Sequence, residues 1–212
     1  MSSNHLNKLR IVALGLGLGL GSVALAQETP PPATAADGLS MGSEQKPADG
    51  PGTTYTAATF DDWQQRCVKT EDGSDPCQMY QLLKDGEGNS VAEISMFALP
   101  DGQKAAAGAT VIAPLETLLT ANISLKVDAT QPKVYPFSWC NRLGCYSRVG
   151  FTQAEVDGLK KGSKAVITIV PAAAPTQKVA LNVSLKGFTA AYDAVKASNA
   201  KLPKPAAKPA GN

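Results

Sequence analysis

Val134 to Phe151 is the stretch that decides the fold, and it reads VYPFSWCNRLGCYSRVGF. Two runs of aromatic and β-branched residues flank a short loop at 141–144, a pattern typical of a β-hairpin. Cys140 and Cys145 stand at the mouth of that loop. If the two cysteines face each other, counting outward gives the register, which pairs Trp139 with Tyr146, Ser138 with Ser147, and Phe137 with Arg148.

This register predicts two different faces, because side chains alternate along a strand. One face carries Pro136, Ser138, Ser147 and Val149 with the two cysteines. The other face carries Tyr135, Phe137, Trp139, Tyr146 and Arg148. Aromatic and arginine side chains dominate interaction hot spots, so the second face is a candidate platform for a sugar or a protein. The alternative is a face packed in the core, with Arg148 over Phe137 at its edge.

The first 26 residues are organised like a secretory signal peptide. Lys8 and Arg10 form a basic region, 11–23 is apolar, and Ala24-Leu25-Ala26 offers a small-x-small cleavage site. The apolar run is too short for a good membrane span, which needs about 20 residues. We therefore expect cleavage after Ala26, export to the periplasm or beyond, and a mature chain without a transmembrane span.

Cleavage would also limit the available chemistry, because it removes His5, the only histidine. A chain without histidine has no Ser-His or Cys-His catalytic pair and no histidine-ligated metal site. The loss of Lys8 and Arg10 takes the formal charge from +2 to zero. This balance gives no reason to expect a nucleic-acid partner. We expect neither a metal nor another cofactor, and the oligomeric state is open.

The four cysteines predict two disulfides, because an exported chain meets an oxidising compartment. Three connectivities are possible. The local one, Cys67–Cys77 with Cys140–Cys145, is favoured because each pair brackets turn-like sequence and opposed hairpin residues lie within disulfide reach.

Composition divides the rest of the chain. Residues 27–56 are rich in Pro, Ala and Gly and contain few large apolar side chains, so we expect a disordered linker. The aromatic residues lie within 55–192, which predicts a folded domain at 57–197. The Lys, Pro and Ala of 198–212 predict an extended tail.

Within the domain, about nine short strand-like runs alternate with turn signals. The clearest run alternates Val179, Leu181 and Val183 with polar or small residues. Thr152 and Glu155 match a capping box at the start of a short helix, and 189–197 is predicted to form a closing helix. The pattern predicts a mainly β fold, an antiparallel β-sandwich or barrel-like domain with one or two short helices.

Reactive chemistry has weak support in the sequence. The spacing of Cys140 and Cys145 differs from the Cys-x-x-Cys redox motif, so a structural staple is favoured over a thiol redox centre. A zinc site would need all four cysteines to converge. The acidic pairs Asp61-Asp62 and Glu71-Asp72 suggest general acid–base catalysis on a glycan, but they lie in or beside turns where acids are ordinarily solvated.

Four segments resemble the invasion-associated locus B family of exported bacterial proteins. They are DWQQRC at 62–67, PLETLL at 114–119, YPFSWCNRLGCYSRVGF at 135–151 and SLKGFTAAYDAV at 184–195. Their order and spacing span the predicted domain. Glu116 departs from the glycine that the family often carries after Pro-Leu, which puts only the local turn in doubt.

The resemblance implies a periplasmic or outer-envelope protein, in a family named for host-cell invasion, and it supplies no catalytic residues. The leading hypothesis is therefore a non-enzymatic β-domain that binds an envelope component or a host protein. The alternatives are an envelope-glycan hydrolase that uses paired carboxylates, and a thiol–disulfide redox protein.

Overall fold

The computed structural model describes residues 43–44 and 49–202, which contain eleven strands and two α-helices. The predicted signal peptide and most of the predicted linker and tail lie outside these residues. The strands are β1 (Thr54–Phe60), β2 (Trp63–Val68), β3 (Cys77–Lys84), β4 (Ser90–Ala98), β5 (Ala107–Ala113), β6 (Ile123–Val127), β7 (Lys133–Tyr135), β8 (Phe137–Asn141), β9 (Gly144–Phe151), β10 (Ala165–Ile169) and β11 (Val179–Val183). The helices are α1 (Gln153–Lys161), α2 (Phe188–Asn199) and a short 3₁₀ turn, η1 (Leu119–Ala121).

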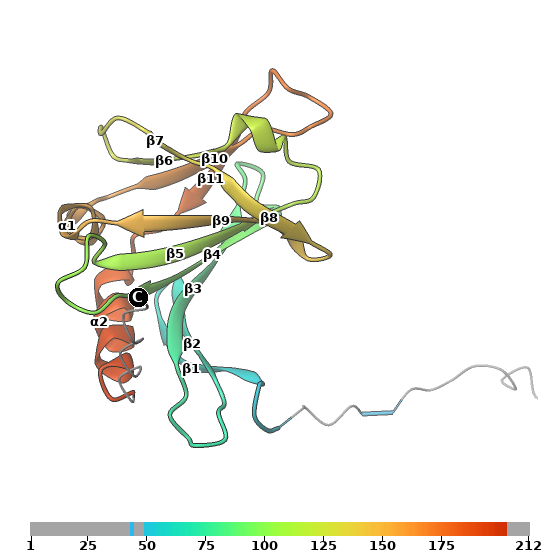
Figure 1. Ribbon diagram of the computed structural model, residues 1–212. Coiled ribbons are helices and arrows are strands. Elements are labelled where there is room, and N and C mark those ends of the chain that lie inside the picture. Colours follow the sequence, from blue (N-terminus) through green and yellow to red (C-terminus); the bar gives the residue numbers. More distant parts are fainter. Residues whose placement is uncertain (1–42, 45–48, 203–212) are drawn as a thin grey trace, which may run out of the picture. The chain divides into compact units, whose positions relative to one another are not determined.

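The strands form one antiparallel sheet that curls into a nearly closed barrel (Figure 1). Its order is β7-β6-β10-β11-β3-β4-β5-β9-β8, and β1 and β2 extend from β3. The two end strands, β7 and β8, follow each other in the chain with only Pro136 between them. One extended segment therefore pairs with β6 through its first half and with β9 through its second half. The predicted antiparallel, barrel-like fold class is confirmed.

Pro136 marks the point where this segment changes partners. Proline has no N–H to donate to a ladder, so it suits the junction between two pairings. Its carbonyl accepts a hydrogen bond from the hydroxyl of buried Ser147, at 2.9 Å. A side chain of β9 thus satisfies the Pro136 carbonyl at the place where the barrel closes.

Alternating side chains build the core, as the sequence pattern predicts. On β4 the buried residues are Ala92, Ile94 and Met96, and on β11 they are Leu181 and Val183. Each set occupies alternate positions, because successive residues of a strand face opposite sides of the sheet. The buried side chains of the strands and both helices form one continuous core.

Helix α1 begins at its predicted cap, and α2 begins one residue before its predicted start. The hydroxyl of Thr152 accepts from the Glu155 amide, and the Glu155 carboxylate accepts from the Thr152 amide, which confirms the capping box. In α2 the buried residues include Phe188, Tyr192 and Val195. Phe188 packs edge-on against Trp63, with ring centroids 5.5 Å apart. Since Trp63 is fully buried, α2 covers the inner face of β2 and β3.

The Gln81 side chain lies where β3 stops pairing with β2 and begins to pair with β11. The first half of β3 pairs with β2, and Lys84 near its end pairs with β11. The Gln81 side chain accepts from the Ser184 amide at 2.8 Å and donates to the carbonyls of Asp62 and Ser184. The buried Gln81 side-chain amide thereby satisfies hydrogen-bonding groups of the Asp62 and Ser184 backbone that are not paired with a neighbouring strand.

Two of the strand-like runs in the sequence are each divided in the structure, residues 59–68 between β1 and β2 and residues 134–140 between β7 and β8, so about nine runs become eleven strands. The run from Thr59 to Val68 is not one strand: Asp61 has a positive φ of 49° and lies in the turn of the β1–β2 hairpin. Aspartate tolerates this conformation, and the pattern of hydrophobic residues does not reveal it. Strand β1 begins at Thr54 and α2 ends at Asn199, so regular structure reaches past 57–197 on both sides.

Candidate binding surface at the stapled hairpin

The hairpin predicted within residues 134–151 forms from β8 and β9, and both predicted disulfides are present. Cys140 bonds Cys145, with Cα atoms 4.0 Å apart, and Cys67 bonds Cys77. The register pairs Cys140 with Cys145 and Trp139 with Tyr146, as expected. Asn141 and Gly144 then close a tight turn at the tip.

A β-bulge makes the rest of the predicted register wrong. Phe137 pairs with Ser147, where the sequence predicted Arg148, because the register shifts between Phe137 and Trp139. A bulge places one extra residue, here Ser138, in one strand, and the side chains beyond it change faces. Uniform alternation cannot anticipate this.

The bulge separates the five residues of the predicted platform. Phe137 turns inward with buried Ser147, and Tyr135 lies opposite buried Ile123 on β6. Both rings are half-buried and pack against the core, and burial raises the pKa of the Tyr135 hydroxyl. For these two residues the core alternative is the observed arrangement.

The other three platform residues lie on the outer face of the sheet. Trp139 and Tyr146 stack with ring centroids 5.0 Å apart and an interplanar angle of 12°. Trp139 is 46% exposed, and Arg148 is also exposed. Arg148 lies opposite Thr110 on β5, so it does not rest on Phe137. We call Trp139, Tyr146 and Arg148 with Ile112 and Thr110 the hairpin surface.

Beyond the hairpin surface, the same face of the sheet continues in rows of paired residues. One row runs from Arg148 through Thr110 and Ser95 to Tyr80. The next runs from Trp139 through Tyr146, Ile112 and Glu93 to Leu82. Because α2 packs on the opposite, inner face, neither of the two α-helices in the described residues covers these rows.

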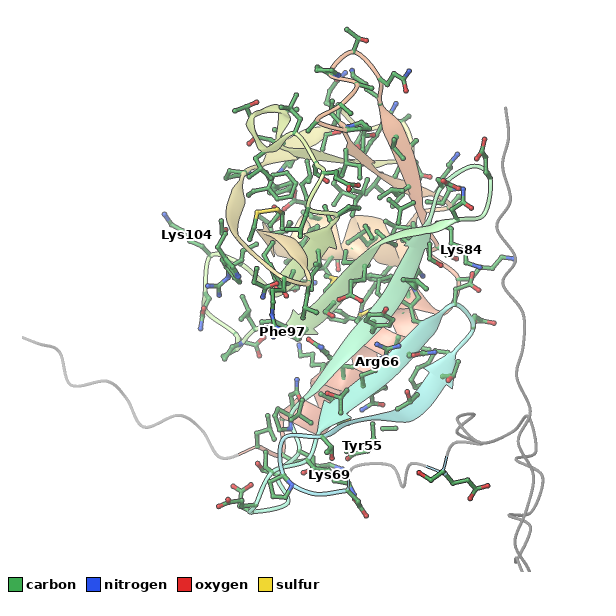
Figure 2. All side chains as sticks on the ribbon, turned by 90° about the vertical axis from the view of Figure 1, so that its right-hand side faces the viewer. Tyr55, Arg66, Lys69, Lys84, Phe97 and Lys104 are labelled. Atoms are coloured by element: carbon green, nitrogen blue, oxygen red, sulfur yellow. A yellow bond between two sulfur atoms is a disulfide. The ribbon has the colours of Figure 1, made fainter. Side chains whose placement is uncertain are left out.

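The far end of the first row is rigidly organised. The Arg66 guanidinium lies 3.3 Å from the centroid of the Tyr80 ring, and the Tyr80 hydroxyl donates to Glu93 at 2.9 Å. Burial, followed by the hydrogen bond to Glu93, raises the pKa of Tyr80. Figure 2 shows Arg66 and Phe97 on this broad side of the sheet, with α2 behind it. Only the hairpin end of the rows therefore leaves both an aromatic stack and an arginine exposed.

The first disulfide, Cys67–Cys77, joins β2 to β3, and hydrogen bonds connect it to the end of α2. The Asn199 side chain accepts from the Cys77 amide at 2.9 Å and donates to the Cys77 carbonyl at 2.8 Å. Within the loop, Asp75 accepts hydrogen bonds from the Thr70 amide and the Tyr55 hydroxyl. Bonds from Thr70 and then Tyr55 hold the pKa of Asp75 below its usual value. These hydrogen bonds tie the Cys67–Cys77 disulfide into the surrounding fold, which favours a structural role for it.

The acidic pairs proposed for catalysis lie at opposite ends of β2, which spans six residues, or roughly 20 Å. Paired glycosidase carboxylates lie about 5–9.5 Å apart. Asp62 accepts from the Ser184 hydroxyl in a turn. Hydrogen bonds from Thr70 and Ser74 lower the pKa of Asp72 to about 2, which keeps it ionised and unsuited to donate a proton at neutral pH.

Other reactive centres find little support in the described part of the chain. All four cysteines are oxidised in the two disulfides. Among residues 43–44 and 49–202, no three His, Cys, Asp or Glu side chains gather in a way that would hold a metal ion. Within the same residues, no helix has the length and apolarity to cross a membrane.

Sequence reasoning missed a second feature, a hollow of about 190 Å³ beside β8. It is lined by Leu119, Asn122, Phe137, Ser138, Trp139 and Cys140. Asn122 directly follows η1 and has a positive φ of 58°. The sequence shows that Asn122 directly precedes a strand that begins at Ile123. It does not show that Asn122 lies near β8, because that proximity depends on how the barrel closes.

Comparison with known proteins connects this architecture to a family. The family model described as "Invasion associated locus B (IalB) protein" matches residues 63–196. The chain belongs to the IalB family. The match begins at Trp63 and ends within α2, so it covers the barrel from β2 onward.

Relatives of this IalB protein agree with that assignment. This chain is 32% identical over 165 residues to the "Invasion protein B homolog" of Brucella abortus, both in strain 2308 and in biovar 1 strain 9-941. Each alignment covers 77% of this chain and 91% of the relative. The crystal structure of invasion associated protein B from Bartonella henselae matches with a TM-score of 0.53 at 22% identity, over 65% of this chain and 94% of that one. This structural match supports the fold.

Proposed function

We propose that this IalB protein is exported and acts by binding a protein or an envelope component, without catalysis of its own. The observation that carries the proposal is the hairpin surface, where the stacked Trp139–Tyr146 pair and exposed Arg148 lie on a sheet face that no helix of residues 49–202 covers. Tryptophan, tyrosine and arginine are the residues most enriched in interaction hot spots.

The rigidity of the hairpin strengthens the case for binding. The Cys140–Cys145 disulfide joins the strands beside the aromatic pair, and Tyr146 pairs with Ile112 on its other side. A surface already held in one conformation loses little entropy when a partner docks. This property favours a recognition surface over an incidental exposed ring.

Export and a role in invasion form the broader part of the proposal. The basic, apolar and small-residue pattern of 1–26 supports cleavage after Ala26, and two disulfides suit an oxidising compartment. The Brucella relatives are called invasion protein B homologs. We extend this to a contribution to host-cell invasion or to envelope function.

The catalytic and redox alternatives have weaker support. A glycan hydrolase needs two close carboxylates with different protonation, whereas the acidic pairs lie at opposite ends of β2. A thiol redox protein needs accessible thiols, whereas the four cysteines are joined in two bonds.

The test is retention of envelope components by immobilised mature protein purified from the periplasm, with its intact mass checked for a start at Gln27. We expect Trp139→Ala and Arg148→Ala each to weaken retention at least tenfold. Leu82→Ala is the matched apolar control, because Leu82 is also 46% exposed and lies four strands away on the same face. Lys126→Ala removes one exposed cation from β6 as the charge control.

Equal retention by Trp139→Ala, Arg148→Ala and the two controls would contradict the proposed surface. Far-ultraviolet circular dichroism and thermal unfolding of each variant establish that the fold is intact, so a loss of retention is assigned to the surface.

A further inference from the structure

The hollow lies between β8 and the segment that precedes β6, beside the seam where the β7–β8 segment closes the barrel. Strand β8 pairs with β9 along one edge, and its other edge faces the segment 119–122 that precedes β6. Lining residues come from both sides of this gap: Leu119 and Asn122 from one, and Phe137 to Cys140 from the other. We call this site the seam hollow.

The seam hollow combines an aromatic wall with hydrogen-bonding groups. Trp139 lines it, whereas Tyr146, which stacks on the Trp139 ring, does not. Within residues 49–202, the side-chain amide of Asn122 and the hydroxyl of Ser138 make no hydrogen bond. Both groups are therefore available to a ligand.

The backbone of β8 adds further polar groups. The Cα atoms of Cys140 and Cys145 are 4.0 Å apart, which matches the close, non-hydrogen-bonded type of antiparallel pair. In such a pair the N–H and C=O of each residue point away from the partner strand. Those of Cys140 therefore point from β9 toward the seam hollow.

Asn122 is held in a conformation that few residues adopt. Its φ of 58° is combined with a ψ of 179°, a sparsely populated region for any residue with a side chain. Such backbone conformations cluster at ligand sites, where the surrounding structure maintains them. Here the strained position places a half-buried amide at the hollow.

We propose that the seam hollow binds one pyranose ring of a glycan. A pyranose has an apolar C–H face, which packs on an indole, and a rim of hydroxyl groups, which pair with an amide, a hydroxyl and free backbone groups. The volume of about 190 Å³ lies below the roughly 300–1,000 Å³ typical of sites for drug-sized ligands, so it suits a single ring.

An extended peptide is the competing occupant, because the outer edge of β8 pairs with no other strand of residues 49–202. Strand addition requires backbone contacts along several successive residues. The segment 119–122 faces that edge, and the hollow between them is small, so the observations favour a compact amphipathic ring. The inference rests on the proposed function in one respect, since Trp139 belongs both to the hairpin surface and to the seam hollow. Asn122 belongs to the hollow alone.

The indole N–H signals in nuclear magnetic resonance test the inference on the mature protein. The chain has two tryptophans. Trp63 is fully buried and donates to the Ser184 carbonyl at 2.8 Å, so its signal is an internal control. Titration with glucose, galactose and N-acetylglucosamine should move the Trp139 signal saturably for at least one sugar and leave Trp63 unchanged.

Asn122→Gly is the decisive variant. Glycine adopts positive φ without strain, so this change keeps the fold and removes only the amide. We expect sugar affinity to fall at least tenfold while thermal stability is kept. Arg148→Ala and Leu82→Ala should bind the sugar as the parent protein does. An unchanged Trp139 signal with all three sugars, or parental affinity in Asn122→Gly, would overturn the inference.

The two proposals fail separately in this design. Loss of partner retention in Arg148→Ala without any sugar response overturns the seam hollow and leaves the hairpin surface intact. A Trp139 response to an extended peptide of alternating valine and threonine, with none to the three sugars, would assign the hollow to strand addition and overturn the glycan site.

Discussion

Single residues decide how closely the parts of this barrel approach one another. Gly187 is the N-cap of α2 and has a positive φ of 76°. A Cβ atom at this position would lie 2.0 Å from the carbonyl oxygen of Phe60, which belongs to β1. Since backbone atoms cannot move aside as a flexible side chain can, glycine is required where α2 meets the first hairpin. The same glycine lies in the segment SLKGF, which carries part of the family resemblance.

Gly187→Ala should therefore destabilise the protein by about 2–4 kcal/mol, from the strain of positive φ and the displacement of β1. Gly158→Ala is the matched control: Gly158 lies within α1, and an added Cβ would meet no atom within 4 Å. That change should stabilise the protein by up to about 1 kcal/mol, because alanine favours helix. Urea unfolding measures both, and equal stabilities of the two variants would contradict the packing described for Gly187.

At the scale of elements, the β8–β9 hairpin shows how far pattern reasoning reaches. The turn residues and the two cysteines predicted the hairpin, its staple and the Trp139–Tyr146 pair. The bulge at Ser138 was not predictable, because it depends on Phe137 being drawn into the core and on Pro136 changing partners. The capping box at Thr152 was predictable, since both of its residues act locally. The turn at Asp61 was not predicted, because the pattern of apolar residues on both sides of it does not reveal the positive φ that aspartate tolerates.

Removal of the staple should act on the aromatic pair directly. We expect Cys140→Ser with Cys145→Ser to lower the free energy of unfolding by about 2 kcal/mol, the chain-entropy value for so short a loop. The near-ultraviolet circular dichroism of the Trp139–Tyr146 stack should weaken. Cys67→Ser with Cys77→Ser should lower stability by about 3 kcal/mol and leave that signal in place. A stack signal that is unchanged by loss of Cys140–Cys145 would show that the sheet alone organises the hairpin surface.

On the scale of the whole molecule, the barrel is closed by a single segment that passes from β7 to β8 at Pro136. The sequence predicted a mainly antiparallel β-fold because turn signals and alternating runs are local. Closure was beyond it, since the pairings of β6 with β10, of β11 with β3 and of β5 with β9 join segments far apart in the sequence. The hairpin surface was predicted in part: Trp139, Tyr146 and Arg148 lie outside, whereas Tyr135 and Phe137 complete the core. The seam hollow arises only when the barrel is assembled.

The most direct measurement of the central claim, that the hairpin surface is where this IalB protein meets its partner, is photocrosslinking in intact cells. A photoreactive residue replaces Thr110, which lies opposite Arg148. A second probe replaces exposed Ala154 on α1 as the control. Crosslinking to one defined envelope or host component from position 110, weakened by Trp139→Ala and absent from position 154, is the predicted result. The same products from both positions, or from position 110 with and without Trp139, would contradict the claim.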